Sequence, residues 1–544
     1  MERERIYTDV LVIGGGGAGS RAAYEAKRLY PRLDVTVAVE GKWGKTGSTV
    51  WVASEALGIN APINAAGDGD SPEIFLRDIV ETGLGTANEA MVKIIAHEST
   101  DRINELVALG ATFDTVKGKY VQKKLSGCTR ARSLTRGGQT GVEIVEALRK
   151  ASRELGVSVI EGIRIIDLIV CDGEVWGARG IREGRQIDIA AKAVIMACGG
   201  AGGLFPHSVT HRSLRGDGYA MACRAGAVMS GMEFIQIGPG VVFPAMHFII
   251  HAHMWRFVPR LKNRLGEEFL RRYVPPEMSI DDVITLKAMS FPFSVRTNAK
   301  YIDIAMSKEI LAGRGTEHGG VFFDITHVSR EELQDKAPIT YQTFLDKGVD
   351  LSRHAIEIAP LVQSLNGGIK IDEDAASSLR GLFAVGEASG GVHGADRPGG
   401  NNLADSQVFG YRGGQAAAQL AVDRSGDMPA PESSPVLGVG PDAQEALTAI
   451  HPEIDAALMV VRNRTHLDAL LAKIESYRRT HETLDVATDN VLLVAEMIAR
   501  SALLREESRG IHYREDFPDT SPSYGRATLV QRDDEGRLAA TFEG

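Results

Sequence analysis

A chain of 544 residues is too long for one hydrophobic core, so we expect it to divide into two to four domains. Its composition, with 44% hydrophobic and 24% charged residues, is that of an ordinary globular protein, and its 60 glycines exceed average usage. The net charge of −10 and the absence of a long basic run exclude nucleic acid and anionic membranes as expected partners.

The hydrophobic pattern predicts neither a membrane helix nor a signal peptide. No apolar run reaches the ~20 residues that span a bilayer, and the N-terminus passes from charged residues almost directly into an apolar strand. We therefore expect a cytoplasmic protein without an integral membrane segment.

The cysteines favour ordinary reduced thiols. They are scattered without a CxxC spacing, at Cys128, Cys171, Cys198 and Cys223. The chain is therefore expected to supply no metal site, iron-sulfur cluster or covalent haem of its own. Any further redox centre would lie on a partner.

The first forty residues predict a dinucleotide-binding site. A short apolar run is followed by glycines that satisfy GxGxxG at Gly14, Gly16 and Gly19. A helix-prone stretch then leads to a second apolar run, 35–39, which ends in Glu40, where this fold places the acid that binds ribose hydroxyls. The glycines allow a sharp turn, close approach to a pyrophosphate and tight packing of helix on strand. Strand, helix, second strand and acid together favour a dinucleotide site over a plain turn.

Further elements follow in chain order. Residues 41–60 are rich in glycine and small residues, as expected of a loop around a cofactor larger than a nicotinamide dinucleotide. Apolar residues at helical spacing predict helices over 71–109 and 138–155. Short apolar runs predict strands at 157–160, 163–171 and 174–181. Residues 193–202 repeat the pattern of an apolar strand that leads into glycines, and a helix is expected to begin near Asp217.

The second half of the chain changes character twice. Residues 232–356 are richer in aromatic residues and histidine, and the glycine motifs return from residue 358. A Gly, Pro and Ser-rich linker at 425–442 is followed by helical periodicity, and the polar end of the chain contains a possible strand pair at 527–532 and 537–542. This pattern predicts one doubly wound domain that is interrupted by an inserted domain.

Six segments carry a resemblance to a known family: GGGGAG at 14–19, TGSTVWVAS at 46–54, ACGGAGGLF at 197–205, GDGYAMACRAGA at 216–227, VGEASGGVHGADRPGGNNLADSQVFG at 385–410 and REESRGIHYREDFP at 505–518. With these motifs the chain resembles, over nearly its whole length, the flavoprotein subunits of the succinate dehydrogenase and fumarate reductase family. That family also includes L-aspartate oxidase and the alpha subunit of adenylylsulfate reductase.

The resemblance implies an α/β fold with four parts. A Rossmann-like FAD-binding domain, residues 1–231 and 357–430, would be interrupted by an α+β capping domain at 232–356 that contributes to the substrate site. A C-terminal helical domain would cover 440–516, and a tail would cover 517–544.

FAD is the cofactor that the resemblance implies. Gly14, Gly16 and Gly19 would face the pyrophosphate, and Glu40 would face the adenosine ribose. Asp217 would lie at the ribityl or phosphate region. These positions are those that match the family's motifs in this sequence.

The same resemblance places further residues around the ring systems. Glu387, Asn402 and Leu403 would close over the isoalloxazine, and Gly199 and Gly200 would lie on the adenine side. Ser48 and Thr49 would contact the flavin. Many family members attach the flavin covalently through a His that precedes a Thr-Val pair, but here Thr49-Val50 follows Ser48. We therefore expect noncovalent FAD.

The expected substrate clamps are mostly missing. Family members that handle succinate or fumarate hold two carboxylates with His and Arg side chains, because Arg binds a carboxylate through paired charge-assisted hydrogen bonds. Arg397 matches one clamp Arg. Gly238-Pro239-Gly240 stands where the family has His-Pro-Thr-Gly, and Gln363 stands where it has a second His.

The proton-donating Arg of the family aligns with Ala299, with Arg296 and Lys300 nearby in the sequence. Loss of both His clamps and of this Arg removes much of the carboxylate and transition-state stabilisation. The resemblance therefore implies a substrate other than fumarate.

A histidine-rich segment in the inserted domain is a second candidate site. His247, His251 and His253 lie close together, next to Trp255. One hypothesis is a substrate site in which His253 is a general acid and Trp255 stacks on a ring. The alternative is a partly buried strand whose His side chains are structural. A metal site is the weakest hypothesis, because HxH has no identifiable third ligand.

Two other groups keep alternatives open. The inserted domain contains a basic cluster of Arg256, Arg260, Lys262, Arg264, Arg271 and Arg272. This cluster would either bind an anionic substrate or dock an acidic iron-sulfur partner. The alternative is a solvated helix face without a binding role. His393 is expected to hydrogen-bond on the flavin side rather than to be a catalyst. Arg505, Arg509 and His512 match family positions that look structural or interfacial.

The sequence thus predicts an FAD-dependent oxidoreductase. A hydride or electron pair would pass between flavin N5 and a small anionic substrate, with Arg397, His253 and Arg296 as catalytic candidates, and electrons would continue to a ferredoxin-like iron-sulfur subunit, quinone or oxygen. One alternative is an electron-transfer subunit of a larger complex with a degenerate substrate pocket. Another is fumarate reductase, L-aspartate oxidase or adenylylsulfate reductase-like activity through shifted residues.

Overall fold

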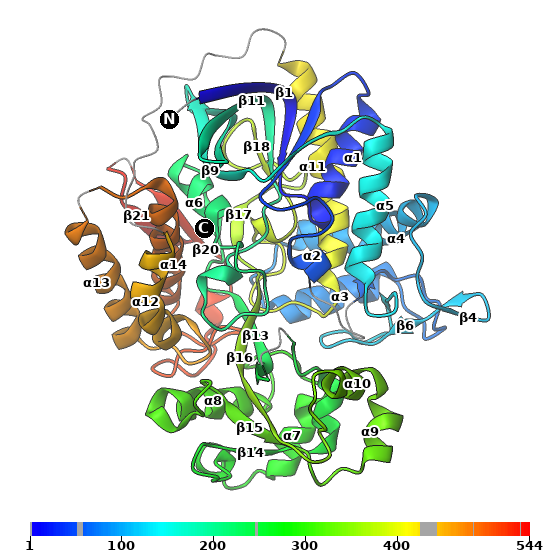
Figure 1. Cartoon of the computed structure of the whole chain (residues 1–544), viewed down its shortest axis with the longest axis vertical. Helices are drawn as coiled ribbons and strands as arrows, with labels where there is room; N and C mark the ends of the chain where they lie inside the picture. Colours follow the sequence, from blue (N-terminus) through cyan, green and yellow to red (C-terminus); the bar gives the residue numbers. More distant parts are fainter. Residues whose placement is uncertain (1–2, 52–57, 245–247, 425–442, 482, 534) are drawn as a thin grey trace.

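The computed structural model of the chain describes residues 3–51, 58–244, 248–424, 443–481, 483–533 and 535–544. Within these ranges the main body contains a seven-stranded sheet in the order β8-β2-β1-β11-β10-β9, with β18 beside β11. The strands are β1 (Arg3–Ile13), β2 (Val35–Val39), β8 (Ser158–Glu161), β9 (Arg164–Cys171), β10 (Glu174–Arg182), β11 (Arg185–Met196) and β18 (Leu382–Ala384). Figure 1 shows this sheet in the upper part of the molecule.

The central strands are parallel and buried. β1 pairs in parallel with β2 and β11, and β18 pairs in parallel with β11. Residues 10–13 of β1 are buried, as a continuous apolar run in a parallel sheet must be. The predicted strand, glycine turn, helix α1 (Gly17–Leu29) and second strand are all confirmed.

Helix α1 lies against α11 (Asn401–Asp423), and both cover the sheet with α5 (Thr140–Glu154) nearby (Figure 1). The two helices approach closely because small residues meet at the crossing. A Cβ atom added at Gly414 would lie 2.5 Å from the carbonyl oxygen of Ala22, and one at Gly410 would lie 2.8 Å from that of Ala18. This contact holds the glycine-rich turn and the start of α11 on one rigid unit.

Smaller elements surround this core. The predicted helical stretch 71–109 contains α3 (Pro72–Gly83), capped by Ser71, and α4 (Glu89–Ala108). The expected loop 41–60 contains one helical turn, α2 (Ser48–Trp51), and residues 52–57 lie outside the described ranges. Short strands and turns complete the region: β3 (Ile59–Asn60), β4 (Thr115–Val116), β5 (Lys119–Tyr120), β6 (Gln122–Lys123), β7 (Ser133–Leu134), η1 (Gly202–Leu204), α6 (Asp217–Arg224) and η5 (Gly386–Ala388).

The end of the chain joins a second sheet. The predicted strand pair is confirmed as β20 (Thr528–Arg532) and β21 (Leu538–Phe542), preceded by η6 (Pro522–Tyr524). β20 pairs with β12 (Met229–Ser230), which continues to β17 (Gly368–Lys370) and β19 (Ser389–Gly390). The tail is therefore integrated into the main body, a long-range pairing that its local pattern does not reveal.

The inserted segment forms a lobe at the bottom of Figure 1. The long antiparallel strands β13 (Ile235–Phe243) and β16 (Ile356–Leu365) lead from the main body into it. The lobe also holds β14 (Arg260–Lys262), β15 (Val321–Asp324), α7 (Ile280–Lys287), α8 (Lys300–Glu309), α9 (Arg330–Lys336), α10 (Pro338–Asp346), η3 (Leu270–Arg272) and η4 (Ile310–Arg314). Its separate hydrophobic core includes Trp255, Phe269 and Phe323, as expected of an α+β insertion.

The alternative that the histidine-rich segment is a partly buried strand is wrong for residues 252–257. Residues 252–257 form the 3-10 helix η2 (Ala252–Phe257), in which Trp255 is fully buried. The Trp255 indole donates to the carbonyl of Ile250 and packs against Phe323. Core packing of this aromatic residue therefore overrides the strand-like alternation of the segment, and His247 lies outside the described residues.

The predicted C-terminal helices are α12 (Ala443–Leu458), α13 (Arg464–Thr480) and α14 (Val486–Leu504). Side chains of Asn463 and Asp485 cap the last two. The linker predicted at 425–442 lies outside the described residues. In the part of the chain that the structure describes, no helix is long and apolar enough to cross a membrane.

The crossing of α1 and α11 gives a stability prediction. We expect Gly414→Val to destabilise the protein by about 1 to 3 kcal/mol, because its side chain has no room beside the Ala22 backbone. Gln415→Val, one residue along α11 at a half-buried position, is the matched control with a smaller loss. Urea unfolding followed by circular dichroism measures both, and equal unfolding midpoints would contradict the close contact.

Candidate functional site

A large open cavity lies at the carboxyl ends of β1, β2 and β11, where a doubly wound sheet binds its ligand. It encloses about 1550 Å³ of space that is partly open to solvent. Eleven of the twelve expected cofactor residues line it: Gly14, Gly16, Glu40, Ser48, Thr49, Gly199, Gly200, Asp217, Glu387, Asn402 and Leu403. Residues far apart in the sequence are thus brought to one site.

Gly19 is the exception and does not line the cavity. A Cβ at Gly19 would lie 2.1 Å from the carbonyl oxygen of Gly14, so this glycine permits α1 to pack on the end of β1. The role of Gly19 at the pyrophosphate stays a prediction, and the structure shows this glycine in helix packing instead of at the cavity wall. Gly16 caps α1, whose free N–H groups and positive end face the cavity. The N–H of Gly17 donates to Thr49 Oγ1 at 3.1 Å, which anchors the loop that carries Ser48.

Glu40 and Asp217 interact with the same guanidinium group. Burial raises the pKa of the Glu40 carboxyl, and Arg164 partly opposes this while Asp217 adds to it. The Arg164 guanidinium donates to both oxygens of Asp217, at 3.0 Å for the shorter pair, and Asn490 donates to the same carboxylate at 2.9 Å. Sequence reasoning missed Arg164, because a single Arg at the start of a strand carries no motif.

Gly200 and Glu387 lie against each other. A Cβ at Gly200 would lie 2.3 Å from Glu387 Oε1. The resemblance assigns Gly200 to the adenine side and Glu387 to the isoalloxazine, and the structure brings these two expected positions into contact. Cys198 is half-buried with its Sγ against Gly218, and desolvation raises the pKa of its thiol to about 12. This cysteine therefore stays protonated at neutral pH.

Two oxygens in the cavity wall need a partner. Ser48 Oγ and Gln363 Oε1 are buried, and neither has a hydrogen-bond partner among the described residues. A buried polar atom without a partner is costly, so a bound polar group is expected to supply one. Together with the helix N-terminus and the glycines at the wall, these atoms fit FAD, which presents phosphates at one part and polar flavin edges at another.

Arg397 is buried beside the cavity, with 6% of its surface exposed. Its guanidinium donates to the Pro398 carbonyl at 2.8 Å and to Gln236 Oε1, whereas Nε has no partner among the described residues. Ser364, which lines the cavity, donates to the same Gln236 oxygen at 3.2 Å. Burial lowers the pKa of Arg397 to about 10, opposed by Asp396, Glu387 and Asp405, so the group remains charged at neutral pH.

Arg296 and Arg397 both contact Asp396, whereas His253 lies elsewhere. The Arg296 guanidinium lies 3.5 Å from Asp396, whose carboxylate also accepts the backbone N–H of Arg397 at 2.8 Å. His253 Nε2 instead lies 3.0 Å from Thr340 Oγ1 in α10, and it does not line the cavity. The structure therefore brings two of the three catalytic candidates together and leaves His253 in the lobe.

The remaining candidates are accounted for by local contacts. Burial lowers the pKa of His251 to about 3, so this ring is neutral. Members of the basic cluster pair with nearby acids, including Lys262 with Asp324 at 2.8 Å and Arg272 with Glu267 at 2.7 Å. His393 is buried near Asp405, with 3.6 Å between Nε2 and the carboxylate. Gln236, a polar residue in an otherwise apolar strand, is the signal that sequence reasoning overlooked.

Glu387 gives a pH prediction. Burial raises the pKa of its carboxyl from 4.5 to about 7, although the Leu365 N–H and Arg397 favour the charged form. A carboxyl whose pKa is higher in the folded than in the unfolded protein stabilises the fold most at low pH. This contribution to the free energy of unfolding is lost as the pH rises from the unfolded-state pKa of 4.5 through the folded-state pKa of about 7.

In the flavin-free protein, Glu387→Gln removes this titration but keeps an acceptor for Leu365. Relative to the variant, the wild type is expected to lose about 3 kcal/mol of stability between about pH 5 and about pH 8. Urea unfolding at both pH values measures the difference. A constant difference between the two proteins would show that Glu387 ionises normally.

Comparison with known proteins matches both parts of the chain. A family described as an FAD binding domain matches residues 9–403, and one described as the fumarate reductase flavoprotein C-term matches residues 452–543. The chain is 34% identical over 561 residues to a fumarate reductase (CoM/CoB) subunit from Methanothermobacter marburgensis, and the match covers 98% of each chain. It is 31% identical to L-aspartate oxidase of Caulobacter vibrioides, over 96% of each.

A solved structure shows the same fold over the same length. Mycobacterium smegmatis Sdh1 in complex with UQ1 matches with a TM-score of 0.84 and 30% identity, covering 99% of this chain and 94% of that one. The main body, the lobe and the C-terminal helices therefore share the fold of that structure.

Proposed function

The chain belongs to the succinate dehydrogenase and fumarate reductase flavoprotein family as an FAD-dependent oxidoreductase, and we propose that its substrate is a small anion other than fumarate. The observation that carries the proposal is the buried Arg397 guanidinium beside the cofactor cavity, with its Nε lacking a partner among the described residues. A carboxylate or similar anion supplies the acceptor that this nitrogen needs.

FAD, when bound, supplies the hydride or electron-pair chemistry of its ring. The residues of this chain bind and orient. The N-terminus of α1 would face the phosphates, and Arg397 would hold the anionic group of the substrate. Arg296, 3.5 Å from Asp396, offsets the negative charge of that carboxylate next to Arg397. Glu387, with a pKa of about 7, exchanges a proton at its carboxyl near neutral pH.

The surroundings of the expected second clamp favour a single anionic group. A Cβ at Gly238 would lie 2.9 Å from the Phe291 ring, so this aromatic side chain occupies the space that a clamp side chain would need. Gln363 presents a neutral amide to the cavity, and Ala299 is buried at the start of α8. A dicarboxylate would leave its second charge without a cationic partner at these positions.

Fumarate reduction is the second candidate function. It is favoured by the 34% identity, over nearly the full length, to a protein named as a fumarate reductase subunit. L-aspartate oxidase-like and adenylylsulfate reductase-like activities through shifted residues are weaker alternatives. Anaerobic oxidation of a reduced dye separates these activities, with fumarate, L-aspartate and single-charge carboxylates compared in parallel assays.

A partner is also proposed. The relative from Methanothermobacter marburgensis is named as a subunit, which supports a complex in which an iron-sulfur protein or a similar subunit passes electrons. A relay role with a degenerate pocket predicts that no small substrate bleaches the flavin of the isolated chain. Bleaching by a substrate without a partner would exclude that alternative.

The flavin attachment has a direct assay. We expect acid precipitation of the purified protein to release yellow colour into the supernatant, because Ser48 occupies the position of the attaching His. An iron-sulfur absorption band is expected only in a complex from native cells. Colour retained in the pellet would mean a covalent flavin, and a colourless protein would contradict the cofactor site.

Arg397→Gln tests the anion site. The variant is expected to retain FAD and to lose about 10- to 100-fold in kcat/KM, because a charge-assisted contact to the substrate is replaced by a weaker neutral one. Arg424→Gln is the matched control, since Arg424, which directly follows α11, is also buried but binds the Val175 and Lys192 carbonyls and Glu174. Unchanged steady-state kinetics in Arg397→Gln would contradict the proposed function.

A further inference from the structure

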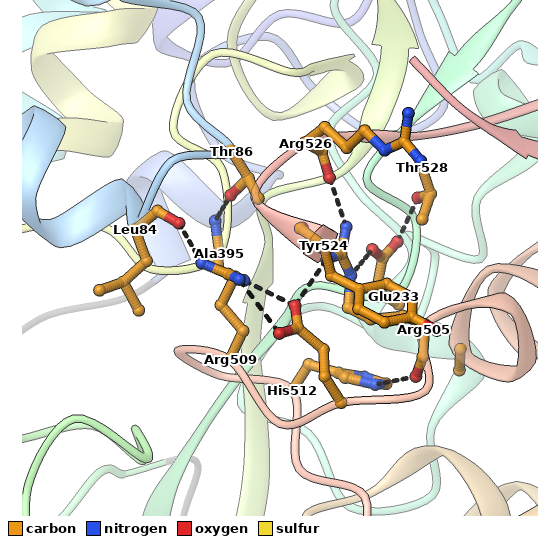
Figure 2. Close-up of polar contacts among 12 residues, drawn as sticks. Leu84, Thr86, Glu233, Ala395, Arg505, Arg509, His512, Tyr524, Arg526 and Thr528 are labelled. Carbon is orange, nitrogen blue, oxygen red and sulfur yellow. Dashed lines mark hydrogen bonds and ion pairs between the residues drawn. The ribbon is translucent and has the colours of Figure 1, made fainter. Parts of the chain in front are cut away.

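The C-terminal segment 505–512 lies against the loops that carry both arginine candidates. We propose that Arg509, held by Glu507, is a positioning residue that fixes Arg397 and Arg296 for binding of the anion; this inference rests on the proposed function. Hydrogen bonds join this segment to the loop of Arg397 and to that of Arg296, and Figure 2 shows the contacts of Arg509 with Leu84 and of Thr86 with Ala395.

The first set of contacts fixes the backbone before Arg397. Ala395, two residues earlier, donates its N–H to Thr86 Oγ1 at 2.7 Å and accepts the N–H of Ile511 at 2.9 Å. Thr86 follows the C-terminal turn of α3, and the guanidinium of Arg509 donates to the carbonyl of Leu84 in that turn. Figure 2 shows Arg509 pointing toward Leu84, with Thr86 beside Ala395.

The second set fixes the loop that carries Arg296. The carbonyl of Gly510 accepts the N–H of Val295 at 2.7 Å, immediately before Arg296. Gly510 has a φ of +55°, and a Cβ there would lie 2.1 Å from the carbonyl oxygen of Ala395. Two consecutive residues of the segment thus bind both loops at once, and only glycine allows the approach.

Arg509 is itself held in a fixed orientation. Glu507 accepts from its Nε at 2.6 Å and from its Nη2 at 3.0 Å, and the carbonyl of Ser521 accepts from Nη2 at 2.7 Å. The side chain is almost fully buried, with 7% exposed. A planar guanidinium makes these contacts and the one to Leu84 together, whereas a lysine ammonium cannot.

A third connection reaches the side-chain partner of Arg397. Glu507 also accepts from Arg505 at 2.9 Å, and Arg505 donates to Glu233 at 2.7 Å. Glu233 lies three residues before Gln236, which binds the Arg397 guanidinium. Figure 2 shows Glu233 between Arg505 and Thr528. The same cluster therefore fixes both the backbone and the side chain of Arg397.

His512 completes the cluster as a neutral acceptor and donor. Burial and the neighbouring Arg462, Arg505 and Arg514 hold the pKa of its ring well below the ordinary value. Arg462 can only donate, so its 2.9 Å contact makes Nδ1 of His512 the acceptor and leaves Nε2–H to face the Arg505 carbonyl at 3.4 Å. The ring adds no charge to the arginines around it.

The test measures anion affinity at the flavin rather than turnover. Sulfite adds through its sulfur lone pair to N5 of oxidised flavin and bleaches the visible flavin band, and nearby positive charge stabilises the anionic adduct. Sulfite is titrated into FAD-loaded protein, and the dissociation constant is expressed per bound flavin. Wild type is expected to form the adduct.

Arg509→Lys is compared with Arg424→Lys, because each native arginine binds two backbone carbonyls and one carboxylate. We expect Arg509→Lys to weaken sulfite binding at least about fivefold. Arg424→Lys is expected to lose thermal stability without a change in sulfite affinity. Thr86→Val should reproduce the weakening and Thr86→Ser should restore wild-type affinity, which tests the clamp even where Arg509→Lys fails to fold.

The variant Arg397→Gln distinguishes a failure of the proposed anion site from a failure of the positioning role of Arg509. If it binds sulfite as wild type does, the anion site of the proposed function is wrong and the inference fails with it. If it binds more weakly while Arg509→Lys and Thr86→Val bind normally, only the positioning role fails. The double variant Arg397→Gln, Arg509→Lys should bind no more weakly than Arg397→Gln; an additive loss would mean that Arg509 does not act through Arg397.

Discussion

A guanidinium group taken out of water must find acceptors for its N–H groups, since an uncompensated buried charge costs several kcal/mol. Arg397 meets this constraint only in part: Pro398 and Gln236 accept from its terminal nitrogens, and Asp396, Glu387 and Asp405 surround it with negative charge. Its Nε lacks a partner among the described residues. The protein therefore holds a positive group beside the cavity with one N–H that no described residue accepts, and the proposed anion site rests on this N–H.

The same constraint organises the C-terminal segment. Arg462, Arg505 and Arg514 are fully buried, and each donates to backbone carbonyls as well as to carboxylates or a neutral ring. Such bonds connect residues that are hundreds of positions apart in the chain. Mispairing would leave buried charges unsatisfied, so the cluster favours one arrangement of the loops it binds. The segment that looks most remote from the chemistry is thus in contact with the loops that carry it.

The strands β13 and β16 link the cavity to the lobe. Gln236 and Ser364 face each other across this ladder, and Gln363 lines the cavity from the next position. Further along the same strands, Gly238 packs against Phe291. The ladder carries polar side chains at both ends, with Gln236 and Ser364 beside the cavity and Glu357 bound to His318 at the lobe end.

The sequence pattern correctly predicted the elements whose formation depends on residues close together in the chain. The glycine turn, the helices over 71–109 and the terminal strand pair all follow from neighbouring residues, and the structure contains each of them. The sequence pattern gave the wrong element where contacts with residues far away in the chain determine the local structure. Trp255 turns a strand-like segment into a 3-10 helix because its indole belongs to the lobe core.

The candidate site also contains both residues that a local motif identifies and residues whose roles depend on distant contacts. Arg397 was identifiable from its motif, but its link to Gln236 and the clamp formed by Arg509 depend on contacts between segments far apart in the sequence. Arg164 likewise gained its place from the pairing of β9 with the rest of the sheet. No spacing in one sequence encodes such pairings.

The most direct measurement is a crystal structure of the FAD-loaded protein grown with acetate. We predict the acetate carboxylate within hydrogen-bond distance of Arg397 Nε, next to the flavin ring, with Arg296 on the other side of Asp396. A structure in which Arg397 Nε is satisfied by a group of this chain, and acetate binds elsewhere, would contradict the anion site.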